Sequence, residues 1–292
     1  MRFGTPIGGE KMLLAFLTLV VSILTLFEYP KWAMVVLSAS IVYGALSTLV
    51  SARRLYFLSA ASAHVSLLAV VLAIPLSRLA LNEYIWAVLI GLIMIHAVGY
   101  SIRRGMDEDV ATAIFVSFAA SLSVIAMYIV LTTYSMSYDL WAIIIGDPLL
   151  ATWGDVAWVS AVAVLTLIAT ILTYREQITI GVERDCAVLT GIRVEYYDFL
   201  LYTLLAVSTV AMIRVVGFVL QHVLIFLPSA IASLVAKDSK SMLSISVLVS
   251  VLSGMLGLQI SVVVNQAPSG VIGLLMFGVF AFTLLAKRCC HE

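Results

Sequence analysis

Charge is scarce in this chain. Only 11% of its 292 residues are charged, whereas 63% are hydrophobic, and the mean hydropathy is +1.15. A soluble domain of this size needs a far more polar surface, so a soluble fold is excluded. The formal net charge is zero, which gives no reason to expect a nucleic-acid partner.

Cysteine and catalytic motifs are also scarce. The three cysteines, Cys186, Cys289 and Cys290, fall in segments predicted to face the cytosol, where a disulfide framework does not persist. No Gly-x-x-x-x-Gly-Lys-Ser/Thr motif occurs, so the chain has no P-loop for nucleotide phosphates. No Ser/His/Asp or Cys/His set can be assembled from the loops. We therefore expect no enzymatic activity and no cofactor bound by this chain.

Long apolar stretches fill the rest of the sequence. A membrane-spanning helix needs about 20 apolar residues, and helices satisfy their own backbone hydrogen bonds in lipid. The stretches lack the alternation of a β-barrel strand. We predict one all-α, polytopic membrane domain over residues 1–292, with ten spans: Met12–Phe27, Trp32–Val50, Ser59–Leu76, Tyr84–Ile102, Val110–Thr133, Val156–Tyr174, Phe199–Val216, Gly217–Ala236, Met242–Val264 and Gly270–Ala286.

The seventh and eighth predicted spans adjoin directly. Phe199–Ala236 is too long for one straight crossing, and Arg214 with Gly217 marks the expected turn.

Lys and Arg alternate between the gaps. If the N-terminus is inside, 13 of the 16 basic residues lie in inner segments, and Lys31, Arg78 and Arg214 lie outside. Basic residues are retained on the cytoplasmic side, so both termini are predicted to be cytoplasmic.

No Asp, Glu or Lys lies deep in a predicted span. Ionisable groups within a membrane usually mark ion paths or proton relays, and their absence disfavours a proton- or sodium-coupled carrier. The energy for uphill transport would then come from outside this chain.

Two connections differ from the others. The inner segment Arg175–Asp198 is the longest cytoplasmic connection, and Glu183–Thr190 in it is predicted to form a short helix that ends at Gly191. Such a charged helix suits docking to a soluble partner. The outer segment Tyr134–Asp155 contains three Asp and no Lys or Arg, and the sequence leaves open whether it is a surface helix or a loop.

Several motifs occur in an order that resembles a known family. They include Asp107-Glu108-Asp109-Val-Ala-Thr-Ala-Ile, Ile145-Gly146-Asp147-Pro-Leu-Leu-Ala, the inner segment just described, Gly217-Phe-Val-Leu-Gln-His through Ala232, and Ser250 to Gly257 followed by Pro268-Ser-Gly270. From about Trp32 to Leu285 the chain resembles the permeases of metal-type ABC importers, the ABC-3 family, which serve zinc, manganese and iron uptake.

The resemblance implies a set of partners in a prokaryotic plasma membrane. Two copies would enclose the path as a homodimer, two separate ATPase subunits would bind ATP, and an external solute-binding protein would deliver the substrate. The coupling element would be Glu183–Gly191, with contributions from Glu183, Arg184, Asp185, Ala187 and Gly191. Two alternatives stay open: a permease of the vitamin B12 and iron-siderophore type, and a stand-alone carrier or channel.

One departure from the family pattern bears on metal binding. The pattern Gly-Asp-Ala-x-Ser-His-Ala aligns with Ser59 to Val65, which keeps His64 but has Ala60 in place of the aspartate. The resemblance implicates both residues in metal passage, and an imidazole without that carboxylate holds a divalent ion less well.

Three histidines are therefore candidate metal ligands. His64 is either a transient ligand on the path or a packing residue, and His222, next to Gln221, must face the bundle or a water-filled cavity. His96 has no partner at helical spacing, which favours packing. Pro228 is predicted to kink its span and to assist gating. The small residues at Gly254 and Gly257 predict a close helix contact, which the dimer interface could use.

Overall fold

The computed structural model describes residues 7–79, 81–134 and 146–289, and every regular element within them is helical. Nine described helices are long and apolar enough to cross a membrane. They are α1 (Ile7–Glu28), α2 (Pro30–Arg53), α3 (Tyr56–Leu76), α4 (Glu83–Arg103), α5 (Glu108–Thr133), α7 (Trp153–Val182), α9 (Val194–Val235), α10 (Ser239–Val264) and α11 (Pro268–Cys289). Two short elements accompany them, the 3-10 turn η1 (Pro148–Leu150) and the helix α8 (Arg184–Leu189).

Helix α9 is two antiparallel helices joined at Gly217. Gly217 has φ 82° and ψ 162°, a conformation that is essentially restricted to glycine. Asp198 near the start of α9 contacts Arg184 in α8, and the chain has returned to that end of the bundle by Ser239, whose carbonyl accepts a hydrogen bond from Tyr174. Arg214, close to the break, forms a salt bridge with Glu83 at the other end of the bundle. The nine helices therefore make ten crossings, which confirms the predicted number and the predicted turn.

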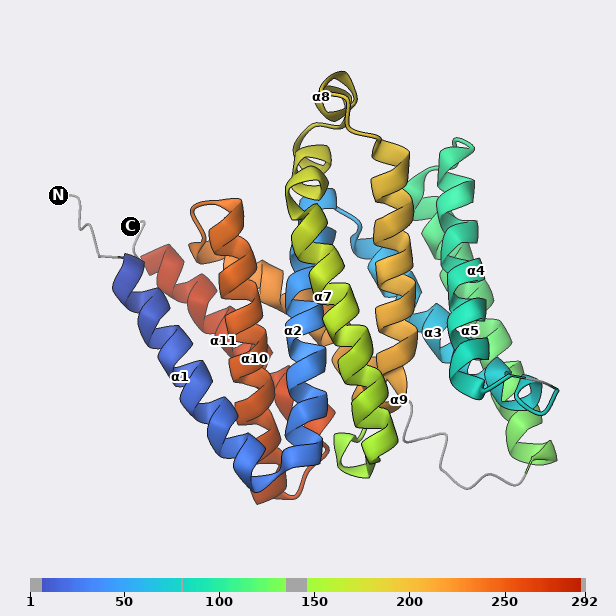
Figure 1. The fold of residues 1–292 in the computed structure, drawn as a ribbon, viewed down its shortest axis with the longest axis horizontal. Helices are drawn as coiled ribbons and strands as arrows, with labels where there is room; N and C mark the ends of the chain where they lie inside the picture. The colour runs from blue at the N-terminus through green and yellow to red at the C-terminus, as the bar shows by residue number, and fades with distance from the viewer. Residues whose placement is uncertain (1–6, 80, 135–145, 290–292) are drawn as a thin grey trace.

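The two ends of the bundle are named here by these landmarks. The α8 end carries α8, and the Gly217 end carries the break in α9. Both ends of the described chain lie on the α8 side, as ten crossings require (Figure 1).

Helix α2 is the centre of the bundle. It packs against α7, α9 and α10, while α3 packs against α4, α5 and α9, and α1 and α11 lie at the side of the bundle away from α4 and α5 (Figure 1). Most of α2 is buried, whereas α1 and α11 expose most of their surface. Exposed apolar helices of this kind are compatible with lipid contact or with a second subunit.

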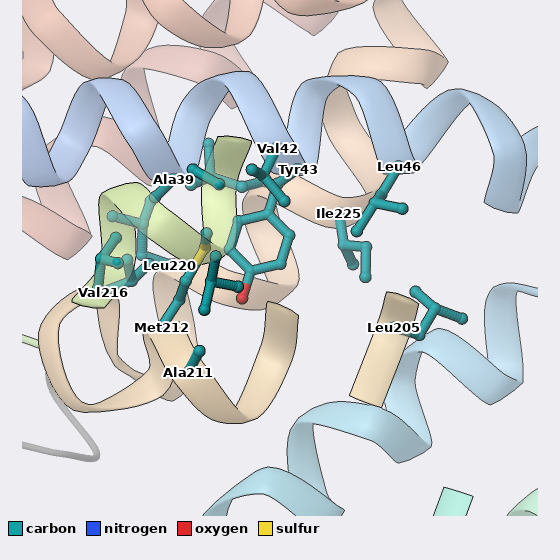
Figure 2. Packing of buried hydrophobic residues seen from close by; sticks show 14 of the residues in the cluster. Ala39, Val42, Tyr43, Leu46, Leu205, Ala211, Met212, Val216, Leu220 and Ile225 are labelled. Atoms are coloured by element: carbon teal, nitrogen blue, oxygen red, sulfur yellow. The ribbon is translucent and has the colours of Figure 1, made fainter. Parts of the chain in front are cut away.

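Tyr43 of α2 fills the centre of the core. It is fully buried beside Met212 and Leu220, one from each half of α9 (Figure 2). Its hydroxyl group donates a hydrogen bond of 3.4 Å to the carbonyl of Ser208. The core therefore holds the folded-back shape of α9 against α2.

The inner connection is shorter than the apolar pattern predicts. Helix α7 continues to Val182, eight residues beyond the predicted end at Tyr174, and α9 begins at Val194 rather than at Phe199. The reason is that Arg, Glu and Gln after Tyr174 are polar but form helices readily. Within the remaining connection, α8 lies at the predicted short helix, and Gly191 follows it with φ 84°.

The small residues of α10 pack within the chain. A Cβ on Gly254 would overlap Ser40 of α2, and one on Gly257 would lie 2.6 Å from Ile272 of α11. These glycines therefore serve internal helix contacts rather than the dimer interface suggested by the sequence.

Pro228 lies inside the second half of α9. Gly217 is the position within α9 at which the backbone leaves helical φ and ψ, so the sharp break in α9 is at the glycine and not at the proline.

The structure describes only part of the outer segment Tyr134–Asp155. Residues 135–145 lie outside the described residues, and the described part contains η1 and the first turn of α7.

Candidate functional site

His64 and His222 lie next to each other in the structure. The break at Gly217 returns the second half of α9 alongside α3, which brings their ring centroids to 5.9 Å. Both side chains are partly buried. Two of the three predicted histidines therefore converge, although 158 positions separate them in the chain.

The hydrogen bond of His222 determines which of its nitrogens is available. Its Nδ1 lies 2.9 Å from the carbonyl oxygen of Phe218. A carbonyl can only accept, so in the neutral ring Nδ1 carries the proton and Nε2 keeps its lone pair. His64 has no hydrogen-bond partner among the described residues, so its ring is also available.

Aromatic rings surround this pair. Phe218 lies 4.9 Å from the His64 ring and 4.5 Å from the His222 ring, measured between centroids. Phe226, 6.4 Å from His222, follows on the same helix face, and Tyr56 of α3 lies 6.4 Å from Phe226. The spacing of four residues from Phe218 through His222 to Phe226 places all three on one face of the helix.

The pair has no carboxylate beside it. In the described part of the chain, no three His, Cys, Asp or Glu side chains come close enough to hold a metal ion. Ala60, at the position of the aspartate in the family pattern, stands one helical turn before His64 and has no side-chain oxygen. One chain therefore offers two imidazoles, fewer than the three or four protein ligands of a stable zinc site.

His96 does not belong to this site. Its ring stacks on Phe199 at 4.3 Å, and its Nε2 lies 3.0 Å from the hydroxyl oxygen of Thr203. That hydroxyl already donates to the carbonyl of Phe199, so it accepts from His96. Because α4 packs against the first half of α9, the His96 ring lies between these helices, and its buried Nδ1 has no hydrogen-bond partner among the described residues.

The predicted coupling segment forms a projection at the α8 end (Figure 1). Ala187 is fully buried and anchors α8 against Ile180 and Val194, and Gly191 ends the helix. Glu183 and Asp185 are exposed. The apolar side chains of Val188 and Leu189 are 58% and 85% exposed, which is unusual for a helix tip away from the apolar spans.

A buried ion pair lies beneath α8, and the sequence did not reveal it. Asp198 accepts hydrogen bonds from Arg53 at the end of α2 and, at 2.6 Å, from Arg184 of α8. Arg53 also donates to Gln177 of α7 at 2.7 Å. In the sequence, Arg53 and Asp198 were only charges at the ends of apolar runs.

This ion pair borders a polar cleft of about 630 Å³. Its lining comes from the ends of α2, α4 and α7, the starts of α5 and α9, and α8. Glu108, from the acidic start of α5, lines it together with Arg53 and Arg184. Two motifs that are far apart in the sequence, the acidic start of α5 and the inner segment that contains α8, therefore meet at the α8 end.

A second polar cluster holds the Gly217 end. Arg214 pairs with Glu83 at 2.5 Å, and its guanidinium lies 4.7 Å above the Tyr84 ring. The Tyr84 hydroxyl donates to Asp155 at 2.5 Å. The cluster joins the starts of α4 and α7 to α9 three residues before its break.

Comparison with known proteins identifies the family of this chain. The model of the ABC 3 transport family matches residues 27–287. The chain is 29% identical over 243 residues to the manganese transport system membrane protein MntC of Halalkalibacterium halodurans, covering 82% of this chain and 81% of the relative. It is 24% identical over 241 residues to the high-affinity zinc uptake system membrane protein ZnuB of Buchnera aphidicola, covering 82% and 90%.

Solved structures share the fold. One is PsaBC from Streptococcus pneumoniae in complex with Fab, with a TM-score of 0.78 at 24% identity over 91% of this chain and 95% of that one. Another is an inward-facing putative metal-chelate type ABC transporter, with a TM-score of 0.70 at 13% identity over 96% and 99%. The chain is a multi-pass membrane protein, and it belongs to the ABC 3 transport family.

Proposed function

We propose that this chain is the membrane-spanning permease subunit of an ATP-binding-cassette importer that moves a divalent metal ion into the cell. The family match supports the transport role. The names of its relatives, a manganese transport protein and a zinc uptake protein, support a metal ion as cargo. The chain has no nucleotide-binding motif, so a separate ATPase subunit supplies the energy.

The observation that carries the proposal is the convergence of His64 and His222 without a carboxylate. Imidazole suits zinc, copper, iron and nickel, whereas manganese favours carboxylate and other oxygen ligands. We therefore infer that Zn²⁺ is preferred over Mn²⁺. Two imidazoles from one chain bind an ion weakly, so a full zinc site needs ligands from a second copy.

A homodimer would complete the site. Two copies with their His64 and His222 rings facing a shared path would supply four imidazoles, the number that tetrahedral Zn²⁺ accepts. The partly buried state of both rings within one chain supports such an arrangement. The solute-binding protein would then dock at the Gly217 end, and that end would face outside, as the basic residues predict.

The ATPase subunit would dock on α8. The exposed Val188 and Leu189 offer an apolar contact, and Glu183 and Asp185 add charge beside it. An exposed apolar tip next to charged residues is typical of an interaction site. Arg184 and Ala187 hold the helix in place, and Gly191 ends it.

Metal uptake tests the cargo and the site together. We expect His64→Ala and His222→Ala to lower Zn²⁺ uptake in cells by about ten-fold or more, because each change removes a ligand. His96→Ala, at a packing position of the same residue type, is the control for expression and folding. Ala60→Asp should raise Mn²⁺ uptake relative to Zn²⁺, because it restores an oxygen ligand.

Three results would contradict this proposal. Equal uptake in the His64→Ala, His222→Ala and His96→Ala proteins would remove the site. Mn²⁺ uptake equal to Zn²⁺ uptake in the unmodified protein would remove the preference. Zn²⁺ transport by the purified chain alone in liposomes, without an ATPase subunit, would make it a stand-alone carrier.

A further inference from the structure

We propose that Asp198 is a positioning residue that joins the coupling helix α8 to both helices that carry the histidine pair. The proposal rests on the proposed docking of the ATPase subunit to α8. It concerns the step after docking, in which a displacement of α8 must reach His64 and His222.

Asp198 binds two elements at once. One carboxylate oxygen accepts from Arg53 and the other accepts from Arg184 at 2.6 Å. The Asp198 and Arg53 side chains are only 4% and 5% exposed, so water weakens their attraction little. Arg184 is 55% exposed, so the salt bridge that joins Asp198 to α8 is more easily broken than the one that joins it to Arg53.

The salt bridge between Asp198 and Arg53 connects α8 to the helix that carries His64. Arg53 is the last residue of α2, and only Arg54 and Leu55 separate it from the start of α3 at Tyr56. His64 lies about two turns into α3. A turn this short has little freedom to absorb a movement of Arg53, so α3 must follow it.

The backbone of Asp198 itself leads to His222. Asp198 lies in the second turn of the first half of α9, which continues as a helix to the break at Gly217. His222 lies in the second turn after that break. The same carboxylate therefore controls both helices whose rings converge at 5.9 Å.

A separate contact holds α7 to this assembly. A Cβ on Gly181 would overlap the backbone of Ala52, so the last turn of α7 lies directly against the last turn of α2. Gln177 of α7 accepts from Arg53 at 2.7 Å and donates to the carbonyl of Tyr197 at 2.8 Å. The ends of α2 and α7 and the start of α9 thus form one connected unit beneath α8.

The burial of this ion pair supports a role beyond stability. Taking two charges out of water costs roughly what their attraction returns, so a buried pair often contributes little net stability compared with apolar residues. Its directional hydrogen bonds do impose one geometry on α2 and α9. That geometry is what a transmission element requires.

The test uses the whole transporter, assembled with its ATPase subunit in liposomes loaded with a fluorescent zinc indicator. The variants are Asp198→Asn, which removes the carboxylate charge at constant size, and Arg184→Gln, which removes only the salt bridge to α8. The controls are Glu195→Gln and Arg193→Gln, which change exposed charges of the same types within five residues of Asp198. Bound ATPase subunit, ATP hydrolysis and Zn²⁺ transported per ATP are measured for each protein.

Asp198→Asn is expected to keep the ATPase subunit bound and hydrolysing ATP, and to lower Zn²⁺ transported per ATP about ten-fold, within the usual range of coupling between sites. Arg184→Gln should act in the same direction, and both controls should match the unmodified protein. An unchanged ratio in Asp198→Asn overturns the proposal. If that variant does not assemble, an unchanged ratio in Arg184→Gln overturns it instead.

The proposed docking is tested separately by reversing the charge of Glu183 and Asp185. Lost docking after this reversal, together with normal Zn²⁺ transport per ATP in Asp198→Asn and Arg184→Gln, overturns the role of Asp198 alone. Docking that survives the reversal overturns the proposed role of α8, and the role of Asp198 with it.

Discussion

Gly217 is the residue at which a 42-residue helical segment folds back on itself, and alanine at this position should destabilise the protein. A non-glycine residue in such a region of φ and ψ costs about 1–3 kcal/mol. Alanine also restricts the unfolded chain, which offsets about 0.4–1 kcal/mol of that cost. The free energy of unfolding should therefore fall by about 1–2 kcal/mol.

The measurement is unfolding by SDS in mixed detergent micelles, followed by tryptophan fluorescence. Gly278→Ala is the matched control, because Gly278 lies inside α11 and a Cβ there would meet nothing within 4 Å. Alanine favours a helix interior over glycine by up to about 1 kcal/mol, so this control should be neutral or stabilising.

The difference in unfolding free energy between the two alanine variants tests whether the fold-back of α9 needs glycine at position 217. Equal unfolding free energies for Gly217→Ala and Gly278→Ala would refute the reasoning. They would mean that α9 can pass residue 217 without the positive φ, and that its fold-back depends on packing alone.

Two further substitutions test the ends of the bundle by the same unfolding measurement. Gly181→Ala should lower the free energy of unfolding by about 1–3 kcal/mol, because its Cβ would overlap the backbone of Ala52. Gly154→Ala is the control and should not lower it, because its Cβ would meet only Thr152 at 3.6 Å. An equal effect of both substitutions would contradict the close contact between Gly181 and Ala52. Tyr84→Phe should cost about 1 kcal/mol through loss of its bond to the Asp155 carboxylate, part of which is exposed to solvent. No change in Tyr84→Phe would mean that water replaces this bond without loss.

The composition and hydropathy of the chain were sufficient to predict the architecture. Apolar runs of about 20 residues give helices in lipid whatever their partners, because the backbone must satisfy its own hydrogen bonds there. The turn at Gly217 was also predictable, since Phe199–Ala236 exceeds one crossing and contains an Arg beside a Gly. The end of α7 was not, because Arg175, Glu176 and Gln177 extend a helix without extending an apolar run.

The histidines show where the residue pattern loses information. His64, His96 and His222 were all candidates, and each lies in a predominantly apolar helix. The structure brings His64 and His222 together and leaves His96 against Phe199 and Thr203. No local pattern distinguishes these outcomes, because the choice depends on which helix faces lie side by side.

Hydropathy and helix-ending residues are local properties of a chain, so they were enough to predict a bundle of membrane-spanning helices with a short charged helix between α7 and α9. Two features could not be predicted without the folded structure: the two imidazoles that meet without a carboxylate, and the Asp198 carboxylate that joins α8 to Arg53. The His64–His222 and Arg53–Asp198 contacts join residues more than 100 positions apart. The first depends on the break at Gly217, which returns α9 alongside α3, and the second on the packing of α2 against the first half of α9.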